Sequence, residues 1–144
     1  MSDPYDLQRF VTAQDEHYPE ICAELRAGFK ESHWMWYVFP QLRGLGSSGL
    51  SQHYGLASLE EARAYLQHPL LGSRLRECTR LVNAVEGRTI RQILGSPDDL
   101  KFRSSMTLFS LASGREEVFE SALRRYCAGE PDPRTLALLG RSAA

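Results

Sequence analysis

Lysine is almost absent from this chain. Of its 17 basic residues only Lys30 and Lys101 are lysines, and all the others are arginines. An amine can lose its proton or form an imine with a carbonyl carbon, which a guanidinium cannot do. The scarcity of lysine makes these two positions candidates for a role that needs an amine. The alternative is that two lysines remain by chance in a chain that favours arginine.

Other absences exclude whole classes of protein. The three cysteines, Cys22, Cys78 and Cys127, contain no C-x-x-C pair, which predicts buried reduced thiols and a cytoplasmic location. No apolar run approaches the roughly 18 residues of a membrane span, and the acidic start of the chain is no signal peptide. The net charge of −1 supplies no field that would attract an anionic membrane or nucleic acid, so we expect neither partner.

What the sequence does contain is a succession of helix patterns. Apolar residues recur at helical spacing, for example over residues 71–85 and 118–126, and the capping box at Ser58–Glu61 marks a helix start. No internal repeat and no linker divides the 144 residues, a length that is usual for one domain. We therefore predict a mainly α fold over residues 1–144, a single compact multi-helix domain with at most a minor β element.

One helix, which follows Ser96-Pro97, is expected to be central. Apolar residues occupy two of its faces: Phe102, Met106 and Phe109, and Leu100, Leu108 and Leu111. A helix that is apolar nearly all round is buried. The hydroxyl groups of Ser104 and Ser105 on this helix therefore need hydrogen-bond partners.

The first turn of the same helix is rich in charge. Asp98 and Asp99 suit the positive N-terminal end of a helix, and this dipole effect alone explains them. Lys101 and Arg103 are electrostatically unfavourable there. We therefore expect something in the fold to compensate for these two cations.

Residues 30–41 concentrate unusual side chains, including both tryptophans, Trp34 and Trp36. Ser32 is placed to cap a short helix, which we favour, although the aromatic and β-branched residues suit a strand equally. The aromatic rings would offer a wall on which a nucleobase or a nicotinamide ring stacks. The alternative is that most of them fill the core, which we expect of Phe39 and of at least one tryptophan.

Two neighbouring features also suggest ligand binding. Residues 44–49 fit G-x-G-x-x-G formally, but Pro69 stands where a dinucleotide site needs an acidic residue, and no βαβ pattern follows. A loop of small residues would still bring backbone N–H groups close to a phosphate or sugar, unless it is only a mobile surface loop. His33, beside Trp34, would serve as an acid or base, or as a hydrogen-bonded structural residue. The four histidines show no metal-ligand spacing, so we expect no metal.

The segment Gly28–Gly46, GFKESHWMWYVFPQLRGLG, resembles domain of unknown function family 1810, a bacterial family. Shorter segments carry the same resemblance: Leu7–Gln14, Tyr54–Leu56, Leu71–Leu75 and Asp98–Phe109. Members of the family are sometimes labelled calpastatin. We regard that label as a misnomer, because the inhibitor is a disordered chain whereas this sequence has a helix-rich core pattern.

The resemblance implies a mainly helical fold similar to that of YbiA and the NADAR group. It also implies a link to NAD or ADP-ribose derivatives and to the cleavage of N-glycosidic bonds. Glu16-His17-Tyr18 is similar to a Glu-His-Tyr motif of that group, although Pro19 departs from its pattern.

Two functions fit these observations, with no cofactor, and the expected ligand is a small molecule, either ADP-ribose-like or a ribosylated base. The first is a NADAR-like N-glycosidase or nucleotide-processing enzyme, with Lys30, His33, Asp99 and Lys101 as catalytic candidates, one lysine acting as an imine-forming amine at ribose C1. The second is a non-catalytic helical module that binds a nucleotide-like metabolite or a protein partner. A third reading gives the aromatic run a packing role alone. The candidate ligand-binding residues are Gln14, Trp34, Trp36, Gln41, Gly44, Gly46, Ser47, Tyr54, Arg103, Ser104 and Ser105.

Overall fold

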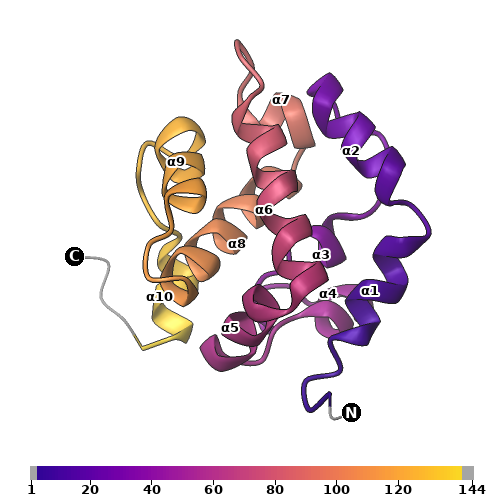
Figure 1. The fold of residues 1–144 in the computed structure, drawn as a ribbon. Coiled ribbons are helices and arrows are strands. Elements are labelled where there is room, and N and C mark those ends of the chain that lie inside the picture. Colours follow the sequence, from indigo (N-terminus) through magenta and orange to yellow (C-terminus); the bar gives the residue numbers. More distant parts are fainter. Residues whose placement is uncertain (1–2, 141–144) are drawn as a thin grey trace.

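The computed structural model describes residues 3–140, which contain ten helices joined by loops (Figure 1). Their bounds are α1 Gln8–Asp15, α2 Tyr18–Ala27, α3 Met35–Val38, α4 Gly49–Tyr54, α5 Leu59–Gln67, α6 Pro69–Asn83, α7 Ile90–Leu94, α8 Asp98–Ala112, α9 Glu117–Tyr126 and α10 Pro133–Leu138. Within this range, the β structure is limited to one isolated parallel bridge between Leu42 and Leu56. The prediction of a mainly α domain is confirmed. Residues 1–2 and 141–144 of the predicted domain lie outside the described residues.

Helix α8 lies at the centre of the molecule, with α5, α7, α9 and α10 packed against it (Figure 1). Its residues Phe102 and Phe109 are fully buried and meet the rings of Phe39 and Tyr65 at centroid distances of 5.1 and 5.4 Å. The expected central helix is therefore present. Leu100 differs from the prediction and is 62% exposed, because the first turn of α8 borders a groove instead of a packed neighbour.

The tryptophan-containing run forms the short helix α3, so the helix alternative is correct for it and the strand alternative is wrong. Ser32 is not its cap. Trp34 occupies the N-cap position, and the Ser32 hydroxyl instead donates to the Glu24 carboxylate at 2.6 Å. The chain turns away before a longer helix can form, because Pro40 follows and cannot donate a backbone hydrogen bond.

The predicted buried thiols are found at two of the three positions. Cys22 and Cys78 are buried, whereas Cys127 is partly exposed because it ends α9 near the surface. All three cysteines are free. Within residues 3–140, no helix combines the length and the apolar character that crossing a membrane requires.

The segment between α3 and α5 brings distant parts of the chain together. Arg43 N–H donates to the Leu56 carbonyl at 2.8 Å and Leu56 N–H donates to the Gln41 carbonyl at 2.9 Å, which closes a loop that contains α4. The Arg134 side chain on α10 donates to the Leu45 carbonyl of that loop at 3.2 Å. This loop, α8 and α10 therefore border one surface depression.

Candidate functional site

A groove of about 490 Å³ lies where the 41–48 loop, α8 and the start of α10 meet, and we call it the Lys101 groove. A cavity of a few hundred cubic ångströms is typical of small-molecule sites. Its polar walls include Gln41, Ser51, Lys101, Ser104, Asp132 and Arg134. Three segments that are far apart in the sequence thus contribute to one concave surface.

A much smaller cavity adjoins the groove, and we call it the Trp36 pocket. Its volume is about 10 Å³, which is room for about one water-sized group. Met35 and Phe39 form its apolar side. It shares Gln41, Ser51 and Lys101 with the groove, so the two cavities have a common wall.

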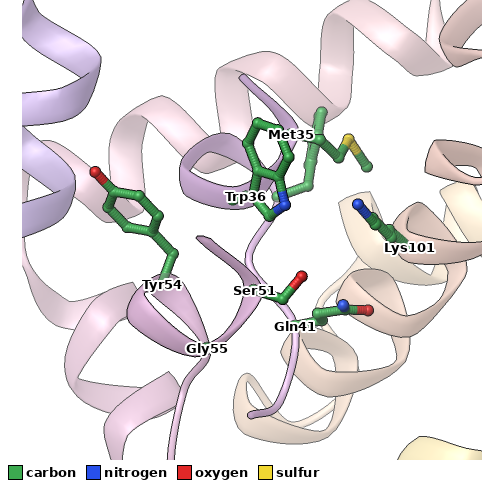
Figure 2. Close-up of a pocket in the computed structure, with 8 residues that line it drawn as sticks. Met35, Trp36, Gln41, Ser51, Tyr54, Gly55 and Lys101 are labelled. Carbon is green, nitrogen blue, oxygen red and sulfur yellow. The ribbon is translucent and has the colours of Figure 1, made fainter. Parts of the chain in front are cut away.

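The indole nitrogen of Trp36 turns toward Lys101, Ser51 and Gln41 inside this pocket (Figure 2). The Nε1 atom is buried and has no hydrogen-bond partner among residues 3–140. A buried donor without a partner costs about 1–3 kcal/mol. The expected role of Trp36 was a stacking surface, but Lys101 already covers the ring, with Nζ 5.1 Å from its centroid.

Lys101 lies between the Trp36 ring and a carboxylate. Its Nζ is 3.7 Å from Asp98 Oδ1, and its side chain is 21% exposed. The ion pair and the cation–π contact together compensate for a cation in the first turn of α8. This is the compensation expected for Lys101, and it leaves the amine at the edge of both cavities. The compensation for Arg103 comes from Glu130, whose Oε2 lies 3.8 Å from the guanidinium group.

Ser51 reaches the shared wall because of the way α4 begins. The Ser48 hydroxyl caps α4 by accepting from Ser51 N–H at 3.1 Å, and it donates to Ser51 Oγ at 2.9 Å. The Ser51 hydroxyl proton is therefore free to be donated. Gly46 packs directly against this serine, since a methyl group added there would lie 2.5 Å from Ser51 Oγ. Close packing therefore explains glycine at position 46.

Two arginines form the outer part of the groove, and the backbone holds both of them. Arg103 donates to the carbonyl groups of Glu130 and Pro131 at 2.9 and 2.8 Å. Arg134 donates to the Leu45 carbonyl. These hydrogen bonds fix the positions of the guanidinium groups, and Arg103 also forms an ion pair with the exposed carboxylate of Glu130 at 3.8 Å.

The groove lining contains one carboxylate, Asp132, and its Oδ2 atom is already hydrogen-bonded. Ser104 Oγ and Thr135 Oγ1 both donate to Asp132 Oδ2, at 2.9 and 2.6 Å. Burial would raise the pKa of Asp132, but hydrogen bonds from Thr135 and Ser104 outweigh it and lower the pKa. Ser104 thus has the partner that its burial demands.

The other lysine and tryptophan of the run lie in a closed cluster. Lys30 Nζ is 2.9 Å from Asp98 Oδ2, and the Lys30 side chain is 7% exposed. It lies 5.2 Å from the centroid of Trp34, which is 1% exposed. Neither residue lines the Lys101 groove or the Trp36 pocket.

Glu24 of α2 anchors this closed cluster. Its carboxylate accepts from the N–H groups of Glu31 and Ser32 at 2.8 and 3.0 Å, and from Trp34 Nε1 at 2.9 Å. Burial would raise the pKa of Glu24, but the hydrogen bonds led by the Ser32 hydroxyl lower it to about 2.

Five other predicted site residues lie outside both cavities. Gln14 is buried and hydrogen-bonded inside the core, and His33 is exposed. Gly44 has a φ of 103°, so the turn itself requires glycine. Asp99 Oδ1 and Ser105 Oγ are buried atoms without a hydrogen-bond partner within residues 3–140, so the partner expected for Ser105 is absent there.

The two cavities do bring together a large part of the predicted set: Trp36, Gln41, Gly46, Ser47, Tyr54, Lys101, Arg103 and Ser104. Ser48, from the predicted loop of small residues, also lines the groove, and three further polar residues were not predicted: Ser51, Asp132 and Arg134. The Asp132-Pro133 helix start is visible in the sequence, but nothing local places it beside the 45–48 loop. Among residues 3–140, no three His, Cys, Asp or Glu side chains gather in a way that could hold a metal ion.

Comparisons with known proteins give two matches of different kinds. A family model described as "Protein of unknown function (DUF1810)" matches residues 4–139. The crystal structure of the conserved hypothetical protein Rv1873 from Mycobacterium tuberculosis is 59% identical, with a TM-score of 0.95 over 97% of this chain and 100% of that chain. No curated protein matches the chain. The resemblance to domain of unknown function family 1810 is confirmed, whereas the similarity to YbiA and the NADAR group stays a prediction. Neither matching description names a ligand or a reaction.

Proposed function

The chain belongs to the DUF1810 family, and we propose that it binds a small anionic metabolite of nucleotide type in the Lys101 groove. The observation that carries the proposal is the excess of cations over carboxylates in the groove lining. Lys101, Arg103 and Arg134 line the groove together with one carboxylate, Asp132. The other two carboxylates near these cations, Asp98 at 3.7 Å from Lys101 and Glu130 at 3.8 Å from Arg103, lie outside the groove lining. A groove of this charge stabilises an anion.

Two features favour a nucleotide-like ligand over a simple inorganic anion. The groove, at about 490 Å³, has room for a sugar and a ring beside a charged group. Its lining is also divided by chemistry. Gly46 and Ser47 offer small polar surface suited to a phosphate or sugar, and Leu45 and Leu100 offer apolar surface suited to a flat base.

Thermal denaturation and calorimetric titration with AMP, ADP-ribose and adenosine test this proposal. We expect AMP and ADP-ribose to stabilise the protein increasingly with concentration, because they bind the native state alone. Adenosine should bind more weakly. Lys101→Ala should lower the affinity for AMP about tenfold. Arg63→Ala removes an exposed arginine of α5 that lines neither cavity and should change nothing.

The outcomes separate cleanly. If none of the three compounds binds at millimolar concentration, the proposal is wrong. If Arg63→Ala weakens binding as much as Lys101→Ala, general surface charge is responsible and the groove is not.

A second function, cleavage of an N-glycosidic bond, is favoured by the position of Lys101. Its amine borders the groove, whereas that of Lys30 is held by Asp98 in the closed cluster. In this reaction the neutral amine of Lys101 would attack ribose C1, and the C1–N bond would break as the base leaves with the bonding electrons and gains a proton. The Asp98 carboxylate lies 3.7 Å away, so it takes the ammonium proton through one bridging water, and a second water hydrolyses the ribosyl–lysine bond to complete the turnover.

Chromatography of the reaction mixture distinguishes an enzyme from a binding module. With NAD or an ADP-ribosylated base as substrate, an enzyme releases free base and Lys101→Ala does not. Saturable binding of these compounds without any free base would leave the non-catalytic module as the function.

A further inference from the structure

The buried indole N–H of Trp36 has no hydrogen-bond acceptor within the part of the chain that the structure describes. Trp34, two residues earlier, donates its indole N–H to Glu24 at 2.9 Å, so the fold can satisfy a buried tryptophan donor where packing alone requires it. Trp36 Nε1 instead turns toward the small pocket at the groove wall (Figure 2). A buried donor without a partner marks a place where an acceptor from another molecule would be stabilised.

The remaining polar groups of the pocket are also able to donate. Lys101 carries an ammonium group, which only donates. The Ser51 hydroxyl already accepts from Ser48, so its own proton is available. The side-chain amide of Gln41 points to the same place (Figure 2), and its nitrogen lies near Gly46, 3.5 Å from where a methyl group there would stand.

We propose that the Trp36 pocket is an oxyanion subsite, which takes one oxygen of a phosphoryl or carboxylate group of the bound metabolite. Trp36 Nε1, Lys101 Nζ, Ser51 Oγ and the Gln41 amide are the donors to that oxygen. The proposal rests on the proposed function, because it assigns one end of the ligand that the groove would hold. It also gives Trp36 the role of a hydrogen-bond donor in place of a stacking surface.

The size of the pocket restricts what enters it. About 10 Å³ admits one oxygen atom and excludes a whole phosphate group, whose other oxygens must remain in the groove beside Lys101 and the arginines. A cation is excluded by the ammonium group of Lys101. A ligand N–H or O–H is excluded as a donor to Trp36, because an indole nitrogen cannot accept.

Calorimetric titration of wild type and Trp36→Phe tests the subsite. Phenylalanine keeps an aromatic ring and removes the donor. The ligands are AMP, adenosine and adenosine 5′-carboxylic acid, which share the base and sugar and differ at the 5′ group. We expect Trp36→Phe to weaken AMP or the carboxylate at least about tenfold, as for a charge-assisted hydrogen bond, and to leave adenosine unchanged. The anion that is more weakened identifies the natural group.

Thermal denaturation of the variant provides the control for folding. Because the substitution removes an unpaired donor, the melting temperature should not fall. If AMP, adenosine and the carboxylate all bind, and bind the variant as tightly as the wild type, the subsite is wrong while the proposed function stands.

If no adenosine compound binds the wild type, the proposed function is wrong and the subsite is tested separately with inorganic phosphate and acetate. The observable is the indole N–H resonance of Trp36 in a nuclear magnetic resonance titration. Movement of this resonance with either anion would support the subsite, and a resonance unmoved by both would overturn it.

Discussion

Two lysine–tryptophan pairs share a single carboxylate, that of Asp98. The first pair is Lys30 with Trp34, and the second is Lys101 with Trp36. Each amine lies over an indole ring, at 5.2 and 5.1 Å from the centroid, and each approaches one oxygen of Asp98, at 2.9 and 3.7 Å. The first pair is closed, with Lys30 7% and Trp34 1% exposed. The second pair borders two cavities, and the Lys101 side chain is 21% exposed.

The difference between the pairs lies in their hydrogen bonds more than in their composition. The Trp34 indole has a carboxylate partner in Glu24, and the Trp36 indole has no partner within residues 3–140. A fully satisfied cluster contributes to stability, whereas an unsatisfied donor at a cavity wall costs stability that a ligand recovers. We therefore assign the first pair to the fold and the second to binding.

The largest effect is expected from breaking the anchor of the closed pair. Glu24→Ala removes the acceptor of Trp34 Nε1 and of two backbone N–H groups, so we expect a loss of about 3 kcal/mol in the free energy of unfolding. Urea denaturation measures it. Glu31→Ala, a nearby exposed carboxylate, is the control and should cost less than about 0.5 kcal/mol. Equal losses in both variants would show that Glu24 has no special role.

Exchanging each tryptophan for phenylalanine should give opposite results. Trp34→Phe leaves the buried Glu24 interaction unmade, and we expect it to cost about 1–3 kcal/mol of stability without changing ligand affinity. Trp36→Phe should leave stability unchanged or slightly higher and weaken an anionic ligand. Denaturation and titration on the same two variants measure both quantities. If Trp34→Phe and Trp36→Phe changed stability and ligand affinity by the same amounts, the assignment of Trp34 to the fold and of Trp36 to binding would be wrong.

Removing the charge of each lysine should also have different effects on stability and on ligand affinity in the two pairs. Lys30→Met should destabilise the protein by about 1–2 kcal/mol, because Asp98 loses its shorter ion pair in a largely buried site. Lys101→Met should instead weaken an anionic ligand about tenfold with a smaller loss of stability. If Lys30→Met also abolishes binding in a protein that remains folded, Lys30 belongs to the site.

Lowering the pH should reduce the free energy of unfolding mainly through Glu24 of the closed cluster. This is the smallest effect on stability that we expect among these predictions. The pKa of Glu24 is lowered from 4.5 to about 2, so its contribution is complete above pH 4.5 and is lost as the pH falls toward 2. Because the carboxylate is partly exposed, solvent reduces this contribution to about 1 kcal/mol. Unfolding free energies of wild type and Glu24→Gln measured between these pH values should converge on acidification. A constant difference would mean that Glu24 does not carry the dependence.

Much of the fold was predictable from local patterns. The succession of helices and the central position of α8 follow from apolar periodicity, because each long helix buries one face or more. The short helix α3 was less certain, since four residues cannot display a period. Its aromatic content suits a strand as well, and the conformation depends on long-range packing such as that of Phe39 against Phe102.

The candidate site was predictable only in part, because contacts between distant segments decide which side chains line it. Unusual composition identified Lys101, Gln41 and Trp36, but it could not separate Trp36 from Trp34. That distinction depends on Glu24, which lies on another helix, and on which indole nitrogen finds an acceptor. Arg134 was missed because its place beside the 45–48 loop is set by a contact across 89 residues of sequence.

The most direct test asks whether Trp36, and not Trp34, meets the ligand. The chain contains two tryptophans, so an isotope-labelled sample gives two indole N–H resonances, and the one that Trp36→Phe removes is thereby assigned. On titration with AMP, we expect the Trp36 resonance to move in proportion to occupancy, because its N–H gains an acceptor, while the Trp34 resonance stays in place. Saturation with AMP that leaves the Trp36 resonance unmoved, or that moves only the Trp34 resonance, would contradict the assignment of the open pair to binding.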